Sequence, residues 1–180
     1  MGTALQSSLQ AKEQLVAELA KLGVRYLSRQ SADSSPSVHM PHELLAMLVC
    51  QPSSRVRAAL IALLLARPDY ARYVSQALTG LKTKDAQTLR FFYTAAVNLQ
   101  QEHAGIFQAA LGVNWCKLPD LFSDELGLTG DSPAVRLQHL ARLHAQSSGE
   151  NLNWEGTYEN AARHLLRRWN QVEKHENNRL

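Results

Sequence analysis

Hydrophobic residues recur at three- and four-residue steps along most of the chain, which is the period of an α-helix. The first such row predicts a helix over residues 4–28, with polar side chains on its opposite face. Its apolar members are Leu5, Leu9, Val16, Leu19, Leu22 and Tyr26. The segment that follows, 30–41, contains SADSSPS and is expected to be a flexible loop, because serine, aspartate and proline favour turns over regular structure.

Prolines divide the next part of the chain into short helices. Pro41 is expected to open a helix that runs to Cys50, because proline suits the first helical turn. Between Pro52 and Pro68, residues 56–66 are apolar almost all round. A helix without a polar face must be enclosed by other helices, so this segment is predicted to be the central, buried element. A fourth helix is expected from Pro68 to a left-handed stop at the glycine of position 80.

A longer apolar row begins after Thr83, which can cap a helix, and continues to residue 111. This helix is expected to be long or gently broken at Gly105, and His103 is expected on its apolar seam as a core histidine. The sequence PDLFSDELGL, residues 119–128, predicts a short helical turn. These elements would precede a loop that leads to the last two helices.

The two C-terminal helices have clear start signals. Ser132 followed by Pro133 predicts a helix that stops before Gly149, and Asn153 is expected to cap the last helix. The last helix carries a regular apolar row, formed by Trp154, Tyr158, Ala161, Leu165, Trp169 and Val172. Its end, 175–180, is expected to fray.

The pattern as a whole predicts an all-α fold: one domain over residues 1–180, built as a bundle of about six or seven helices around a central buried apolar helix. No segment alternates apolar and polar residues as a strand does. Composition agrees, because 45% hydrophobic and 19% charged residues can fill one substantial core.

Composition also bears on the compartment. The longest apolar run, 58–66, is too short to cross a bilayer, and no secretion signal is recognised at the N-terminus. Cys50 and Cys116 have no CxxC partner and lie among apolar residues, so they are expected to be small buried residues. We therefore expect a cytoplasmic protein that does not enter the membrane.

No motif in the sequence assembles a reaction site. His39 and His42 have HxxH spacing but no second ligand cluster, and His139 and His144 are expected on different helix faces. Neither a GxSxG elbow nor a glycine-rich phosphate loop is present in the sequence. The sequence therefore predicts no catalytic residue, no cofactor and no metal site.

Two segments, 91–101 and 153–166, set polar side chains among apolar positions. Such residues either join helices internally or face a partner or ligand, and both alternatives stay open at this point. The candidate binding residues are Tyr93, Asn98, Asn153, Trp154, Tyr158, Arg163 and Arg167.

The segments YTAAVNLQ, LPDLFSDELGL and NWEGTYENAARHLL carry a resemblance to a family. Together they resemble an uncharacterised bacterial all-helical family associated with separate nucleotidyltransferase-like proteins encoded nearby. The resemblance covers residues 50–170 and supplies no catalytic residues to transfer. It implies a binding role beside a separate enzyme.

The leading hypothesis is a non-catalytic helical interaction module whose partner is a protein: a nucleotidyltransferase-like protein, another enzyme that it regulates, or itself. The alternative is an RNA- or DNA-binding protein, including a nuclease, that uses the face of Arg163 and Arg167 and the basic half 1–90, which holds eleven basic against six acidic residues. A third hypothesis is a small-molecule pocket lined by Tyr93, Trp154 and Tyr158.

Overall fold

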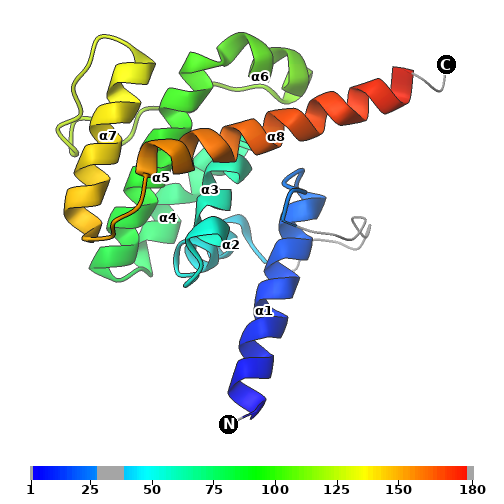
Figure 1. Cartoon of the computed structure of the whole chain (residues 1–180), viewed down its shortest axis with the longest axis vertical. Helices are drawn as coiled ribbons and strands as arrows, with labels where there is room; N and C mark the ends of the chain where they lie inside the picture. The colour runs from blue at the N-terminus through cyan, green and yellow to red at the C-terminus, as the bar shows by residue number, and fades with distance from the viewer. Residues whose placement is uncertain (1, 28–38, 178–180) are drawn as a thin grey trace.

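The computed structural model describes the backbone of residues 2–27 and 39–177 and the side chains of residues 10–27 and 39–170. These residues form eight α-helices and two short 3₁₀ helices, with no strand among them (Figure 1). The helices, in chain order, are α1 (Gly2–Lys21), α2 (Pro41–Val49), α3 (Ser54–Ala66), η1 (Pro68–Tyr73), α4 (Val74–Thr79), α5 (Thr83–Glu102), α6 (Ala104–Leu111), η2 (Gly112–Asn114), α7 (Pro133–Ser148) and α8 (Trp154–Asn177). The all-α prediction is confirmed.

Helix α3 is the centre of this arrangement, as its sequence predicts. Every residue from Ala58 to Ala66 is buried, and so is Val56. Helices α8, α5 and α2 pack directly against it, and α8 crosses in front of α3 and α5 in Figure 1. A helix without a polar face thus obtains the enclosure that it requires.

The two C-terminal helices begin where their sequence signals place them. The Ser132 hydroxyl accepts a hydrogen bond from the Val135 amide, and α7 ends at Gly149 with a left-handed φ of +65°. The Asn153 side chain accepts from the Gly156 amide at 2.9 Å. Within the described part of the α8 row, the first four residues are buried and the fifth is half-buried. These are Trp154, Tyr158, Ala161, Leu165 and Trp169.

Helix α1 is shorter than predicted. It ends at Lys21 because Gly23 adopts a φ of +99°, a conformation that glycine accepts more readily than other residues. The Val24 amide donates to the Leu19 carbonyl at 2.9 Å and the Gly23 amide to the Ala20 carbonyl at 3.3 Å, which is the Schellman pattern of helix ends. The periodic apolar row continues beyond this point to Tyr26, so the sequence pattern did not indicate that the helix ends there.

Helices α5 and α6 meet at His103, two residues before the predicted break at Gly105. His103 is half-exposed at the joint, so the expectation of a core histidine was wrong. The chain turns here because Phe107, rather than Ile106, enters the core, where its ring meets Trp169 at 5.9 Å. The predicted row Leu99, Ile106 therefore does not continue across the joint.

Two of three other expectations need correction. The predicted helix after Pro68 is divided into η1 and α4, and Gly80 ends it with a φ of −96° rather than a left-handed one. Residues 123–127 form turns, and the Leu126 amide donates to the Phe122 carbonyl at 2.9 Å, so the expected helical turn is present as a single turn. Cys50 and Cys116 are free but exposed, because each lies where the chain leaves a helix, so their predicted burial was wrong.

Some expectations fall outside the described residues. They include most of the predicted loop 30–41, the side chains of Leu5, Leu9 and Val172, and the last three residues of the tail. The backbone of 175–177 is helical as the end of α8. Among the described helices, none is both long and apolar enough to cross a membrane.

The glycine stop of α1 can be tested by substitution. Gly23→Ala is expected to lower the free energy of unfolding by about 1–2 kcal/mol, because alanine resists a positive φ. The added methyl group itself would meet only ordinary contact, 3.8 Å from the Ala66 Cβ. Gly80→Ala is the matched control, since Gly80 has a negative φ and open space around it, and it should be neutral or stabilising by up to about 1 kcal/mol. Urea denaturation measures both variants, and equal effects would contradict this account of the stop.

Candidate functional site

The polar residues of α5 are used inside the protein. The Tyr93 hydroxyl donates to the Pro119 carbonyl at 2.8 Å, and Asn98 donates through Nδ2 to the Thr94 carbonyl at 2.9 Å. Gln100, which is buried, donates to the Cys116 carbonyl and accepts from the Leu118 amide. Tyr93 and Gln100 fasten the loop after η2 to α5, and Asn98 bonds within α5, so the polar residues of this segment have internal partners.

Asn98 also joins α5 to α7. Its Oδ1 accepts from Nε of Arg136 at 2.7 Å, and a second guanidinium nitrogen of Arg136 donates to Oε1 of Gln101 at 2.6 Å. Since Asn98 is only 1% exposed, losing Arg136 would leave a buried acceptor without a partner. The packing of α7 on α5 therefore depends partly on this polar contact.

The candidates on α8 separate into two groups. Asn153 caps the helix, while Trp154 and Tyr158 are buried on its inner face. Arg163 and Arg167 lie exposed on its outer part, beside a groove that also contains Glu102, Glu155 and Glu159. The guanidinium of Arg163 lies 3.6 Å from the Glu159 carboxylate. The seven predicted residues therefore do not form one site, and the arginine face carries mixed charge.

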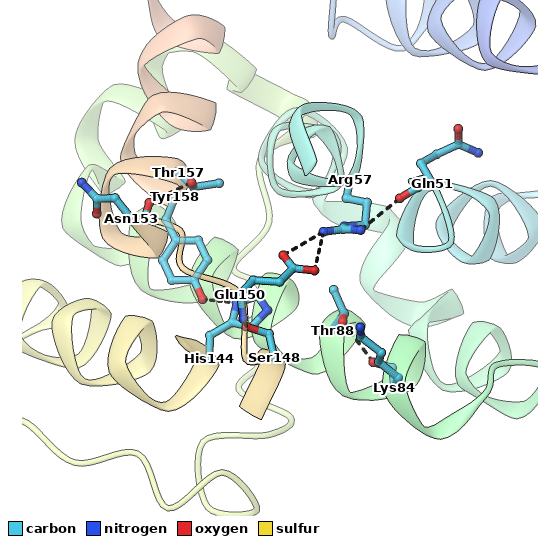
Figure 2. Close-up of polar contacts among 10 residues, drawn as sticks. All are labelled: Gln51, Arg57, Lys84, Thr88, His144, Ser148, Glu150, Asn153, Thr157 and Tyr158. Atoms are coloured by element: carbon cyan, nitrogen blue, oxygen red, sulfur yellow. Dashed lines mark hydrogen bonds and ion pairs between the residues drawn. The ribbon is translucent and has the colours of Figure 1, made fainter. Parts of the chain in front are cut away.

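A polar pocket of about 530 Å³ lies instead where the first turns of α5 meet the end of α7, the loop after it and the start of α3 and α8. Figure 2 shows several of its residues. Of the three aromatic residues expected to line a pocket, only Trp154 does so, since Tyr93 and Tyr158 have no exposed surface. Its lining includes two basic and two acidic residues, and consists of Val49, Arg57, Thr83, Lys84, Asp85, Gln87, Thr88, Phe91, His144, Ser147, Ser148, Glu150 and Trp154. We call it the Arg57 pocket.

Three stacked rings form one wall of the Arg57 pocket. The His144 ring lies between those of Trp154 and Phe91, with centroid distances of 3.6 Å and 4.4 Å and nearly parallel planes. Tyr158 lies next to this stack, and its hydroxyl is 2.7 Å from Nδ1 of His144. This wall is rigid, because all four side chains are buried.

His144 is neutral in this setting. Burial, with a smaller contribution from the positive charge of Arg57, lowers the pKa of His144 from 6.5 to about 3. Burial also raises the pKa of the Tyr158 hydroxyl well above its usual value, so this group keeps its proton. The hydroxyl and Nδ1 share one hydrogen bond, whose donor depends on which nitrogen of the neutral ring carries the proton.

Arg57 faces the same pocket from α3. One terminal nitrogen donates to both carboxylate oxygens of Glu150, at 3.3 Å and 3.2 Å, and the other donates to the Gln51 carbonyl at 3.2 Å (Figure 2). Among the described residues, Nε of Arg57 has no hydrogen-bond partner, although it is buried, and the same holds for Nε1 of Trp154. Two buried donors thus lack acceptors in one pocket.

The sequence alone indicates only part of the Arg57 pocket. The buried face of α7 is formed by Leu137, Leu140, Ala141 and His144. This row has helical spacing, and it could have placed His144 in the core. The Arg57–Glu150 pair joins residues 93 positions apart, and nothing in the local sequence indicates it.

A second feature is an apolar surface on α6. Ile106 is 51% exposed and Val113, in the following η2, is fully exposed, whereas Phe107 is buried. No charged residue occurs between His103 and Lys117. We call the exposed apolar residues Ile106, Ala109, Ala110 and Val113 the α6 surface; the polar side chains of Gln108 and Asn114 are exposed beside it.

The described residues contain no group of three or more histidine, cysteine, aspartate or glutamate side chains that could hold a metal ion. Comparison with known proteins finds no matching family, no matching curated protein and no matching solved structure. Functional inference therefore depends on the α6 surface and the Arg57 pocket.

The Asn98–Arg136 contact can be tested by a double-mutant cycle. Asn98→Ala and Arg136→Met are each expected to lower the free energy of unfolding by about 1–3 kcal/mol, because each leaves a polar partner unsatisfied. The double variant should be little worse than the worse single variant, which gives a coupling energy above about 0.5 kcal/mol. Strict additivity in urea denaturation would show that the two residues act separately. Gln138→Ala, on the exposed side of α7, is the control and should have no effect.

The neutral state of His144 makes stability depend on pH. In the unfolded chain His144 binds a proton near pH 6.5, whereas in the folded protein it binds one only near pH 3. Stability from this residue is therefore fully present above pH 6.5 and is lost as the pH falls toward 3. Between pH 7.5 and pH 5 the loss should be about 2 kcal/mol.

The matched variants are His144→Phe, which keeps the ring stack but does not titrate, and His139→Gln, which changes a histidine bonded to the Thr129 amide. Urea denaturation at several pH values should show a smaller slope for His144→Phe and the wild-type slope for His139→Gln. A wild-type slope in His144→Phe would mean that other groups cause the pH dependence.

Proposed function

We propose that this protein is a non-catalytic helical interaction module that binds a partner protein through the α6 surface. The observation that carries the proposal is an exposed helix without charge. Helix α6 buries only Phe107, while Ile106, Ala109 and Ala110 are exposed. Exposed helices in proteins that act alone normally carry charged residues on their outer face, and contiguous apolar surface is typical of interfaces.

The neighbouring groove favours a particular partner chemistry. A cavity of about 340 Å³ lies where the end of α6, at Ala110 and Leu111, meets the chain after α1 and the half-buried Trp169 of α8. Two arginines, Arg25 and Arg168, also line it. An apolar side chain with carboxylates beside it would match this groove in shape and charge.

This chemistry favours a different protein over a second copy of the chain. In a symmetric dimer built on this surface, both copies would bring the exposed Arg25 into one interface. Like charges opposed across an interface are unfavourable. The partner is therefore a protein that presents an apolar segment flanked by acidic residues.

A separate enzyme is the kind of partner that fits. The resemblance of segments 93–100, 118–128 and 153–166 to a family encoded beside nucleotidyltransferase-like proteins supports such an enzyme as the first candidate. The exposed, free thiols of Cys50 and Cys116 suit a reducing compartment, so we place the interaction in the cytoplasm. Nucleic acid is a weaker candidate, because Glu155 and Glu159 line the same groove of α8 as Arg163 and Arg167.

The proposal predicts a selective loss of partner binding. Ile106→Glu and Val113→Glu are expected to weaken binding by at least about 30-fold, because each puts a charge into an apolar contact. Leu152→Glu is the matched control: Leu152 is 40% exposed but lies on the loop between α7 and α8, beside the other end of α5. All three variants should keep wild-type stability to within about 0.5 kcal/mol, because the side chains are exposed.

The measurement has two stages. Proteins that co-purify with the wild-type chain and with Leu152→Glu, but not with Ile106→Glu, are identified in the native host and then purified. Calorimetric titration of each purified candidate against the three variants follows, with carboxylate-to-amide changes in the partner. Binding that Ile106→Glu leaves intact would refute the α6 surface as the interface.

Two other results would also overturn the proposal. A wild-type dimer in solution that Ile106→Glu converts to monomer would assign the surface to a second copy. RNA binding that weakens steeply with salt and is lost with Arg163→Glu and Arg167→Glu would assign function to the arginine face.

A further inference from the structure

The Arg57 pocket lies at the opposite end of α5 from the α6 surface. Its α5 residues, Lys84 and Thr88, belong to the first turns of a 20-residue helix, whereas α6 follows the last turn. A helix of this length spans about 30 Å, so the two features are independent. Any role of the Arg57 pocket is additional to the proposed interaction.

Arg57 is held in an incomplete ion pair. A guanidinium binds a carboxylate most strongly with two parallel N–H donors, one to each oxygen. Here a single terminal nitrogen serves both oxygens of Glu150, and the adjacent Nε has no partner in the part of the chain that the structure describes. The edge formed by Nε and that terminal nitrogen is therefore only half used by Glu150.

Trp154 supplies an independent sign of a missing acceptor. Its side chain is 2% exposed and lines the Arg57 pocket, yet Nε1 donates to nothing among the described residues. A buried donor without an acceptor costs about 1–3 kcal/mol. Two such donors in one pocket indicate that an oxygen-rich group belongs there.

Other residues of the Arg57 pocket affect its charge. The Lys84 ammonium adds positive charge, and the acidic residues that line the pocket are Glu150 and Asp85. Since Arg57 projects from the central buried helix α3, its position is fixed by the core. The arrangement is preorganised for an anion.

Glu150 takes the place of that anion. It lies on the short loop between α7 and α8, directly after the left-handed Gly149, and its side chain is 32% exposed. Rotation of one side chain on this loop would release Arg57 and open the wall at Trp154. At about 530 Å³ the cavity is within the usual range for small-molecule sites, and it has room for a body as well as an anionic group.

We propose that the Arg57 pocket binds a small organic anion, a phosphate ester or a carboxylate with a compact ring, whose anionic group displaces Glu150 from Arg57. The anion accepts from the Nε edge of Arg57 and from Nε1 of Trp154. The ring occupies the remaining volume beside the stacked wall of Phe91, His144 and Trp154. Glu150 competes with the ligand and so sets its affinity.

The test follows the indole N–H signal of Trp154 by nuclear magnetic resonance in the isotope-labelled full chain. Trp115→Phe and Trp169→Phe identify the three indole signals. The probes are phenyl phosphate and benzoate, with inorganic phosphate as the anion without a ring and benzyl alcohol as the ring without a charge, each at millimolar concentration and low salt.

We expect phenyl phosphate, benzoate or both to shift the Trp154 signal saturably, while benzyl alcohol does not. Glu150→Gln should tighten binding about tenfold, because it removes a competing negative charge. Arg57→Gln should weaken it at least about tenfold, and Arg163→Gln, an exposed arginine far along α8, should leave it unchanged. Preference for one probe assigns the ligand to phosphate esters or to carboxylates, and both results support the proposal.

Three results would overturn the proposal: no saturable shift with either charged ring, an equal shift with benzyl alcohol, or affinity that Glu150→Gln leaves unchanged or weakens. The last would mean that the Arg57–Glu150 pair is only structural. Glu150→Gln keeps the shape and polarity of the side chain, so it tests the proposal even where Arg57→Gln fails to fold. Ile106→Glu should leave the titration unchanged, which separates this inference from the proposed interaction.

Discussion

The enclosure of α3 is the constraint on which the rest of the structure depends. Ten of its thirteen residues are buried, and its two charged residues, Arg55 and Arg57, lie in the first turns. An apolar helix cannot leave a face in water without losing the burial that stabilises the fold, so α2, α5 and α8 must cover it from different sides. The first turns, where the charges begin, are the only part of α3 that can reach a polar surface. This is why Arg57 stands at the edge of the core, beside the polar pocket.

The same enclosure explains how polar residues of the covering helices are used. Helix α5 lies between α3 and α7, so nearly all its residues after Arg90 are buried, including Thr94, Asn98 and Gln100. Each of these finds a partner in its own helix, in the loop after η2 or on α7, because an unsatisfied polar group in the core is costly. His144 meets the same requirement by remaining neutral and bonding to Tyr158. Arg57 and Trp154 depart from this rule, because each has a buried donor without a partner among residues 10–27 and 39–170, and both line the same pocket.

The α6 surface and the Arg57 pocket lie at the two ends of α5. Beyond its last turn, α6 turns inward through Phe107 alone and leaves Ile106 and Val113 outside. Before its first turns, the loop between α7 and α8 brings Glu150 over Arg57 without matching all its donors. One end is apolar and uncharged, and it suits a protein surface. The other is rich in hydrogen-bond donors, and it suits a small anion.

The sequence by itself determined the helical class, the buried central helix and the start points at Ser132 and Asn153, because periodicity and capping act over neighbouring residues. It failed at Gly23 and His103, where a glycine conformation and the choice of Phe107 over Ile106 depend on what packs against the helix end. It named Trp154 as a binding residue but grouped it with Tyr93 and Tyr158, whose hydroxyls have internal partners. Only the tertiary structure decided that Arg57 meets Glu150, since the two are 93 residues apart and no local pattern relates them. Contacts between distant segments are set by how whole helices pack, and that is information that no short stretch of sequence contains.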